Sequence, residues 1–86
     1  MSFYVYMIIS KHNDKILSYV GYTNNIENRI KQHNNSKGAK FTRGKIWRLI
    51  YFEKYHNKVE AMKNEYRLKK NYTLRKKIKK NFLIND

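Results

Sequence analysis

Residues 19–33 (YVGYTNNIENRIKQH) bring a tyrosine, an arginine and a histidine close together in a chain with few acidic residues. Arg29 and His33 are four residues apart, so a helix would place both side chains on one face, at the border between core and solvent. An arginine there can bind a phosphate through two hydrogen bonds and neutralise charge that develops in a transition state. The stretch therefore indicates a site for phosphodiester cleavage.

Two tyrosines and a glycine lie on the strands predicted before and within this stretch. Tyr6 and Tyr19 fall on neighbouring strands, where cross-strand residues can share one surface. A tyrosine beside an arginine and a metal ion would lose its proton more easily and act as a general base on water. Gly21, at a strand end, would let the backbone approach a phosphate closely. Each residue taken alone has a simpler structural explanation. Tyrosines in strands, for example, usually serve packing.

The acidic residues limit the choice of metal ligands. The chain has only six of them, and it has no cysteine. Asp14 falls in a turn, Asp86 is terminal, and Glu27 fits the first turn of a helix, where the helix dipole favours an acid. Magnesium needs only one or two protein carboxylates, whereas the three dispersed histidines do not suit a zinc site. Three acids remain as site candidates: Glu53, Glu60 and Glu65.

Three apolar segments predict the strands that must position these side chains. Residues 3–9 and 16–22 are rich in aromatic and β-branched residues, and polar residues 10–15 between them favour an antiparallel hairpin. Residues 47–55 predict a third strand, which we expect to be the central one. Residues 37–45 (KGAKFTRGK) contain two glycines and four basic residues, and they predict an exposed loop.

Three helices complete the expected order β-β-α-β-α-α. Asn24 or Asn25 can cap the first helix, which carries Ile26 and Ile30 toward the core and ends near residues 34–36. The second helix is expected at residues 58–70 and the third, strongly basic one at residues 73–83. We expect Val59, Met62 and Tyr66 to form the inner face of the second, and Leu74, Ile78 and Phe82 to anchor the third.

Charge is the strongest signal in the composition. Twenty Lys and Arg against six Asp and Glu give a net charge of +14 in 86 residues, a length that suits one domain. Such an excess attracts polyanions, so nucleic acid is the leading partner and an anionic membrane surface the alternative. No apolar run is long enough to cross a membrane. We therefore expect a cytoplasmic protein, associated with the nucleoid, without a membrane partner.

Taken together, these motifs closely resemble the GIY-YIG endonuclease domain over about residues 3–75. The match comprises YVY at residues 4–6, YVG at residues 19–21, an arginine eight residues after Gly21, and a glutamate on a later helix. Tyr4 stands where the first motif has glycine. GAKFTRG and EAMKNEYRLKK further resemble a small stand-alone bacterial branch, similar to the nuclease subunit of structure-specific branched-DNA endonucleases. Residues 1–86 would form one domain, with residues 76–86 as a basic helix or tail.

The resemblance implies a fold, a cofactor and a role for each site residue. The fold would be a small three-stranded antiparallel sheet flanked by helices, of the α+β class. Tyr6 would be the general base that activates water, and Tyr19 would contact the phosphate or that water. Arg29 would stabilise the transition state, and His33 would assist the base or the phosphate. Glu65 would bind one divalent ion, Mg²⁺, for which Mn²⁺ can substitute.

A stand-alone module must bind DNA through its own surface. Contacts from basic side chains to phosphates give salt-dependent affinity without reading sequence. We therefore expect the protein to select DNA by its shape, as branched, flap or nicked forms, in repair or recombination. The alternative is a basic nucleic-acid-binding module that retains the fold without catalysis; whether a partner protein or self-association contributes stays open. The residues expected to contact DNA are Gly21, Lys37, Lys40, Arg43, Lys45, Lys69 and Lys70, with the basic third helix beyond them.

Overall fold

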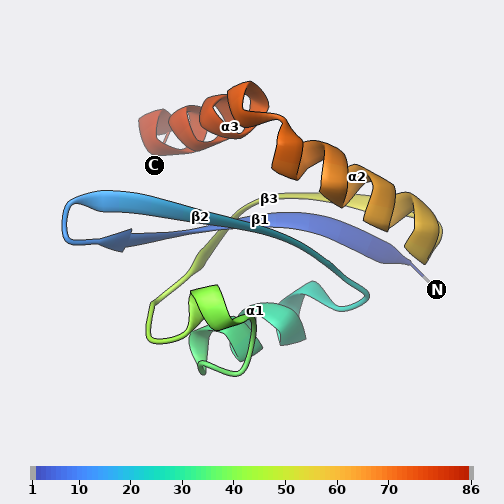
Figure 1. Cartoon of the computed structure of the whole chain (residues 1–86), viewed down its shortest axis with the longest axis horizontal. Helices are drawn as coiled ribbons and strands as arrows, with labels where there is room; N and C mark the ends of the chain where they lie inside the picture. Colours follow the sequence, from blue (N-terminus) through green and yellow to red (C-terminus); the bar gives the residue numbers. More distant parts are fainter. Residues whose placement is uncertain (1, 86) are drawn as a thin grey trace.

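The computed structural model describes residues 2–85, and this part of the chain has the predicted α+β order with one short 3-10 helix added (Figure 1). None of the helices within these residues is long and apolar enough to span a bilayer. The elements are β1 (Phe3–His12), β2 (Lys15–Thr23), α1 (Ile26–Asn34), η1 (Lys40–Thr42), β3 (Arg48–Tyr55), α2 (Lys58–Lys70) and α3 (Tyr72–Asn85).

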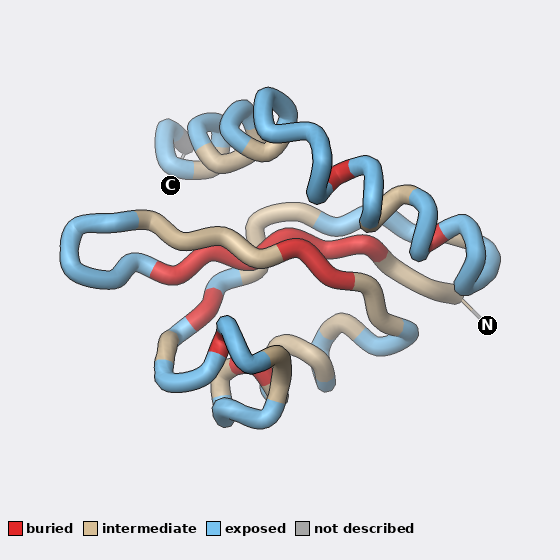
Figure 2. The backbone as a smooth tube through the Cα atoms, in the orientation of Figure 1, coloured by how far each residue is buried: buried red, intermediate tan, exposed pale blue. Residues whose placement is uncertain are grey.

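The three strands form one antiparallel sheet in the order β2-β1-β3, so the central strand is β1. The prediction that the third strand is central was wrong. Residues 5–10 of β1 are buried without interruption, visible as the red stretch through the middle of Figure 2, as expected of a strand covered on both faces. β3 instead has exposed residues along its second half, including Phe52, because it is an edge strand.

The β1–β2 hairpin is longer and tighter than the sequence predicted. Its strands continue through His12 and restart at Lys15, leaving a two-residue turn where a six-residue loop was expected. Asn13 and Asp14 have φ values of 48° and 65°. Two consecutive residues with positive φ match the right-handed twist of the strands, and Asn and Asp tolerate this conformation well.

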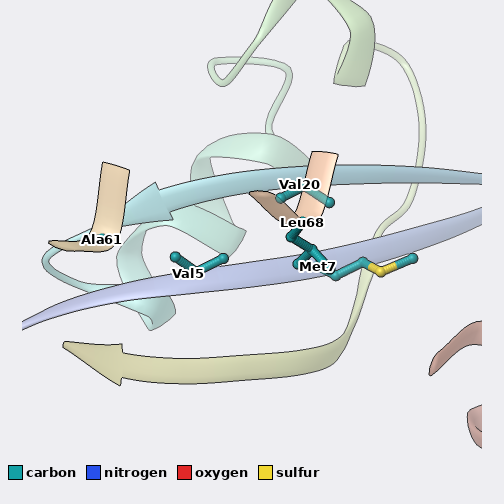
Figure 3. Packing of buried hydrophobic residues seen from close by; sticks show 5 residues of the cluster. All are labelled: Val5, Met7, Val20, Ala61 and Leu68. Carbon is teal, nitrogen blue, oxygen red and sulfur yellow. The ribbon is translucent and has the colours of Figure 1, made fainter. Parts of the chain in front are cut away.

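Each face of the sheet has its own hydrophobic cluster. Helices α2 and α3 cover one face, while α1 and η1 lie on the other (Figure 1). On the α2 side, Val5, Met7 and Val20 of the sheet pack with Ala61 and Leu68 of α2 (Figure 3). The α1 side holds a second cluster of Tyr6, Ile8 and Trp47, against which Ile30 packs.

The inner faces of α2 and α3 differ from those predicted. Val59, Met62 and Tyr66 are exposed, with relative accessibilities of 60%, 45% and 61%. α2 instead buries Ala61 and Leu68, because the small alanine side chain allows the helix to approach the sheet closely. In α3, Ile78 packs against the core as predicted and Phe82 is half-buried, but Leu74 is exposed.

Candidate active site

Gly21 allows the Tyr6 side chain to reach the edge of the sheet. The two residues are direct partners in the β1–β2 register, so both lie on the α1 side. A Cβ atom on Gly21 would lie 2.5 Å from the Tyr6 hydroxyl oxygen and 2.7 Å from its Cζ atom. The phenol therefore passes over the glycine and reaches a cleft beside β2. The glycine was expected to make room for a phosphate; what it accommodates in this structure is the tyrosine.

The Tyr6 hydroxyl is the first member of a buried chain of hydrogen bonds. Its oxygen lies 2.7 Å from Nε2 of His33, and Nδ1 of His33 lies 2.8 Å from the hydroxyl oxygen of Thr42. Tyr6, His33 and Thr42 have relative accessibilities of 1%, 0% and 0%. His33 was expected at the border of core and solvent; it is fully buried because the segment after α1 covers its ring.

Burial dominates the acid-base properties of both rings. It raises the pKa of the Tyr6 phenol to about 12, although the Arg29 guanidinium beside it acts in the opposite direction. The expectation that Arg29 would ease deprotonation of Tyr6 is therefore outweighed by burial. Burial also lowers the pKa of His33 to about 4, and the positive charge of Arg29 adds to this effect. At neutral pH both rings are uncharged.

The Tyr6 side chain borders a polar cleft of about 500 Å³ that brings four of the five predicted catalytic residues together. Tyr19 reaches it from β2 and Arg29 from α1, which follows β2 closely in the sequence, whereas Glu65 comes from the distant α2. His33 does not line the cleft but contacts two residues that do: its Nε2 atom is hydrogen-bonded to Tyr6, and its ring centre lies 5.2 Å from that of Tyr19. The residues that line the cleft are Phe3, Tyr6, Tyr19, Gly21, Tyr22, Thr23, Asn24, Asn28, Arg29, Gln32, Lys58 and Glu65.

Sequence reasoning missed several polar residues of the cleft, among them Gln32, Asn28 and Lys58. Gln32 accepts a hydrogen bond of 2.9 Å from Nη1 of Arg29 and so fixes the direction of the guanidinium. Asn28 and Lys58 line the same cleft and add a neutral polar group and a second positive charge. The i,i+3 spacing of Arg29 and Gln32 was a usable signal. No pattern in the sequence indicated Lys58, because the position of this side chain depends on how α2 crosses the sheet.

Glu65 is the single carboxylate among the residues that line the cleft. Its Oε1 atom lies 3.5 Å from Nζ of Lys69, and its side chain is only 17% exposed. Among residues 2–85 there is no group of three or more His, Cys, Asp or Glu side chains that could hold a metal. A single carboxylate such as Glu65 is a hard oxygen ligand of the kind that Mg²⁺ takes in ones or twos, with water and phosphate oxygens completing its shell.

The basic residues predicted to contact DNA occupy different surroundings. Lys69 pairs with Glu65, and Nζ of Lys70 lies 5.3 Å from the centre of the Tyr66 ring. Lys45 donates a hydrogen bond to the Phe41 carbonyl. The segment expected to be an exposed loop also contains the helix η1 and the buried Thr42, so only part of it faces solvent. Its exposed cations are Lys37, Lys40 and Arg43.

A small α+β domain with tyrosine, arginine and glutamate around one cleft defines a class of catalytic domain. The chain belongs to the GIY-YIG family: the model of the GIY-YIG catalytic domain matches residues 2–79. In general this domain implies nuclease activity, and GIY-YIG nucleases act on DNA.

The chain is also similar to UPF0213 proteins. One from Clostridium perfringens is 53% identical over 66 residues, which is 76% of this chain and 70% of that protein. Another from Haloquadratum walsbyi is 38% identical over 78 residues, covering 90% and 85% of the two chains. The solution NMR structure of a UPF0213 protein from Bacillus halodurans is 41% identical and covers 80% of this chain and 71% of that one, with a TM-score of 0.42.

Proposed function

We propose that this protein is a metal-dependent endonuclease that hydrolyses phosphodiester bonds in DNA. One observation carries the proposal: Tyr6, Tyr19, Arg29 and Glu65, from four different elements, line a single cleft. A protein that only binds nucleic acid has no need for a buried tyrosine aimed at a cleft beside an arginine and a carboxylate. We further propose that it selects branched, flap or nicked DNA in repair or recombination in the cytoplasm.

The hydrogen-bond chain supports a route for the proton of the attacking water. As the water oxygen bonds to phosphorus, its proton passes to the hydroxyl oxygen of Tyr6 while the phenol proton passes to Nε2 of His33. The bond to the leaving oxygen breaks, and that oxygen takes a proton from solvent. This route needs no free phenolate, which suits a tyrosine whose pKa is about 12.

Arg29 has two effects on this route. Arg29 lines the cleft, where its guanidinium can stabilise negative charge on the phosphate in the transition state. Its charge also helps to lower the pKa of His33, after burial itself. A phosphate bound against Arg29 would offset that charge and make His33 a stronger base when substrate is present.

Glu65 would hold the divalent ion, with Mg²⁺ proposed and Mn²⁺ as a substitute. When bound, such an ion stabilises negative charge on phosphate oxygens, including the leaving one. Lys69 would have to release Glu65 or remain as a second, longer-range partner of the carboxylate. Tyr19 lines the cleft, where its hydroxyl can contact the phosphate or the attacking water.

A gel assay on labelled DNA tests the proposal. Duplex, single-stranded, nicked, flap and four-way-junction substrates are incubated with Mg²⁺, Mn²⁺ or EDTA. We expect metal-dependent cleavage that falls by about 10²-fold or more in Tyr6→Phe, as for loss of a general base, and also fails in Glu65→Ala. The ranking of substrates measures the proposed preference for DNA shape.

The chain offers a matched control for each substitution. Glu27 forms an i,i+4 ion pair with Lys31 like that of Glu65 with Lys69, but its side chain is 85% exposed and outside the cleft. The pKa of Tyr51 is likewise raised by burial to about 12, and its hydroxyl donates to Glu53. Glu27→Ala and Tyr51→Phe should cleave normally. Salt-sensitive DNA binding without cleavage in either metal would contradict the proposal and favour the binding module.

A further inference from the structure

Thr42 is fully buried on η1, nine residues after His33. Its hydroxyl oxygen lies 2.8 Å from the Ala39 carbonyl oxygen and 2.8 Å from Nδ1 of His33. A carbonyl oxygen only accepts hydrogen bonds, so the single proton of the threonine hydroxyl must go to Ala39. The hydroxyl therefore accepts from His33, which requires a proton on Nδ1.

The direction of this hydrogen bond determines whether Nε2, on the far side of the histidine ring, donates or accepts. A neutral imidazole carries one proton, so a ring protonated at Nδ1 has a bare Nε2 atom that can only accept. Tyr6 must then donate its hydroxyl proton to Nε2 across the 2.7 Å contact. In the opposite tautomer, Nε2 would carry the ring proton and donate it to the hydroxyl oxygen of Tyr6. That hydrogen bond would occupy the lone pair of the Tyr6 oxygen that receives the proton of the attacking water.

The polypeptide around Thr42 is built to hold it against the ring. A Cβ atom on Gly38 would collide with Nδ1 of His33, so the backbone at this glycine packs directly on the imidazole. The indole nitrogen of Trp47 donates to the Thr42 carbonyl at 2.9 Å. The Asn34 side chain bonds both backbone groups of Trp47, at 2.6 Å and 3.2 Å, and so ties this segment back to α1.

We propose that Thr42 is a positioning residue that holds His33 in the tautomer protonated at Nδ1, so that Tyr6 donates to His33. The importance of this for catalysis rests on the proposed nuclease activity, whereas the tautomer itself does not. Thr42 does not line the cleft, and it acts on the proposed reaction only through His33.

Nitrogen-15 NMR of the histidine rings tests the proposal directly, because a protonated and a bare ring nitrogen give well-separated signals. In the wild-type protein at neutral pH we expect His33 with its proton on Nδ1. Thr42→Val keeps the shape of the side chain but removes the acceptor, and we expect loss of the uniform Nδ1-protonated form. Thr42→Ser restores the hydroxyl and should restore the wild-type signal. His12 and His56 are exposed and serve as internal references.

Cleavage assays on the same proteins test the catalytic consequence. We expect Thr42→Val to reduce the rate at saturating DNA on the order of 100-fold, the lower end of what a general base contributes, and Thr42→Ser to recover most of it. Thr73→Val makes the same chemical change on the exposed face of α3 and should alter neither readout.

The outcomes separate this proposal from the proposed function. A wild-type His33 protonated at Nε2, or a tautomer unchanged in Thr42→Val, overturns the positioning role whatever the cleavage data show. If the valine variant does not fold, the wild-type spectrum alone still tests the predicted tautomer of His33. An Nδ1-protonated His33 that depends on Thr42, in a protein that cleaves no DNA, supports the positioning role and rejects only the nuclease.

Discussion

A buried histidine without charge imposes a cost on folding in acid. His33 is fully buried, and burial together with Arg29 lowers its pKa from 6.5 to about 4 in the folded protein. The unfolded chain therefore binds the proton at a higher pH than the folded chain does. The contribution of His33 to stability is complete above pH 6.5, decreases between 6.5 and about 4, and is lost below that range.

This difference predicts how stability changes with pH. Between pH 7 and pH 5 the free energy of unfolding should fall by about 2 kcal/mol because of His33 alone, given about 1.4 kcal/mol per pH unit for one group. Urea unfolding of the wild type and His33→Gln at the two pH values measures it, since glutamine does not titrate. His12→Gln, on an exposed strand end, is the matched control. An equal change with pH in the wild type and His33→Gln would show that His33 is not the group responsible.

At the scale of elements, the hairpin positions Tyr6 only because its partner is a glycine. A Cβ atom at Gly21 would lie 2.5 Å from the Tyr6 hydroxyl oxygen, and that side chain is buried and hydrogen-bonded, so it has little room to yield. We expect Gly21→Ala to destabilise the fold by about 1–3 kcal/mol through overpacking and to abolish cleavage by displacing the phenol. Thermal unfolding and the cleavage assay measure the two effects.

Gly44 supplies the control for that substitution. It has φ of 73° and nothing within 4 Å of an added Cβ atom, so Gly44→Ala strains only the backbone. We expect a decrease of about 1 kcal/mol in stability with cleavage unchanged. A Gly21→Ala protein that cleaves at the wild-type rate would show that the close contact between β1 and β2 does not position the base.

Local patterns in the sequence were sufficient for the elements and their caps but not for how the elements pack. Asn25 caps α1 through a 3.0 Å bond to the Asn28 amide, and α2 spans the predicted residues 58–70. The rotation of α2 about its axis could not be predicted, because the helix has more apolar residues than positions that the sheet covers. Burying Ala61 and Leu68 brings Glu65, four residues after Ala61, to the inner side and into the cleft.

The order of the strands and the role of Thr42 could not be predicted from the sequence for a similar reason. Strand order depends on pairings between distant residues, and the apolar run in residues 47–55 reads equally well as a central strand or as an edge strand. Thr42 lies in a glycine-containing, basic segment whose composition predicts exposure. Its burial follows from contacts with His33 and Trp47, which the sequence shows only as separate residues.

At the scale of the whole molecule, an excess of 14 positive charges must act on DNA through particular surfaces. The segment around η1 adjoins the cleft, because Phe41 stacks on Tyr19 with ring centres 6.4 Å apart. Helix α3 lies farther from the cleft: it contacts β3 and α2, and its Phe82 ring packs under Arg48 at the opposite edge of the sheet. The cations beside the cleft should therefore dominate binding.

Two triple variants with the same change in charge test this assignment. Lys37→Gln with Lys40→Gln and Arg43→Gln, and Lys76→Gln with Lys77→Gln and Lys80→Gln, each lower the net charge from +14 to +11 (14 − 3). Removing one cation that binds a phosphate flattens the plot of log affinity against log salt by about 0.9. We expect the slope to change by up to about 2.7 for the first variant and by clearly less for the second, measured by fluorescence anisotropy in EDTA. Equal slopes in the two variants would mean that total charge, rather than the segment beside the cleft, determines how the protein binds DNA.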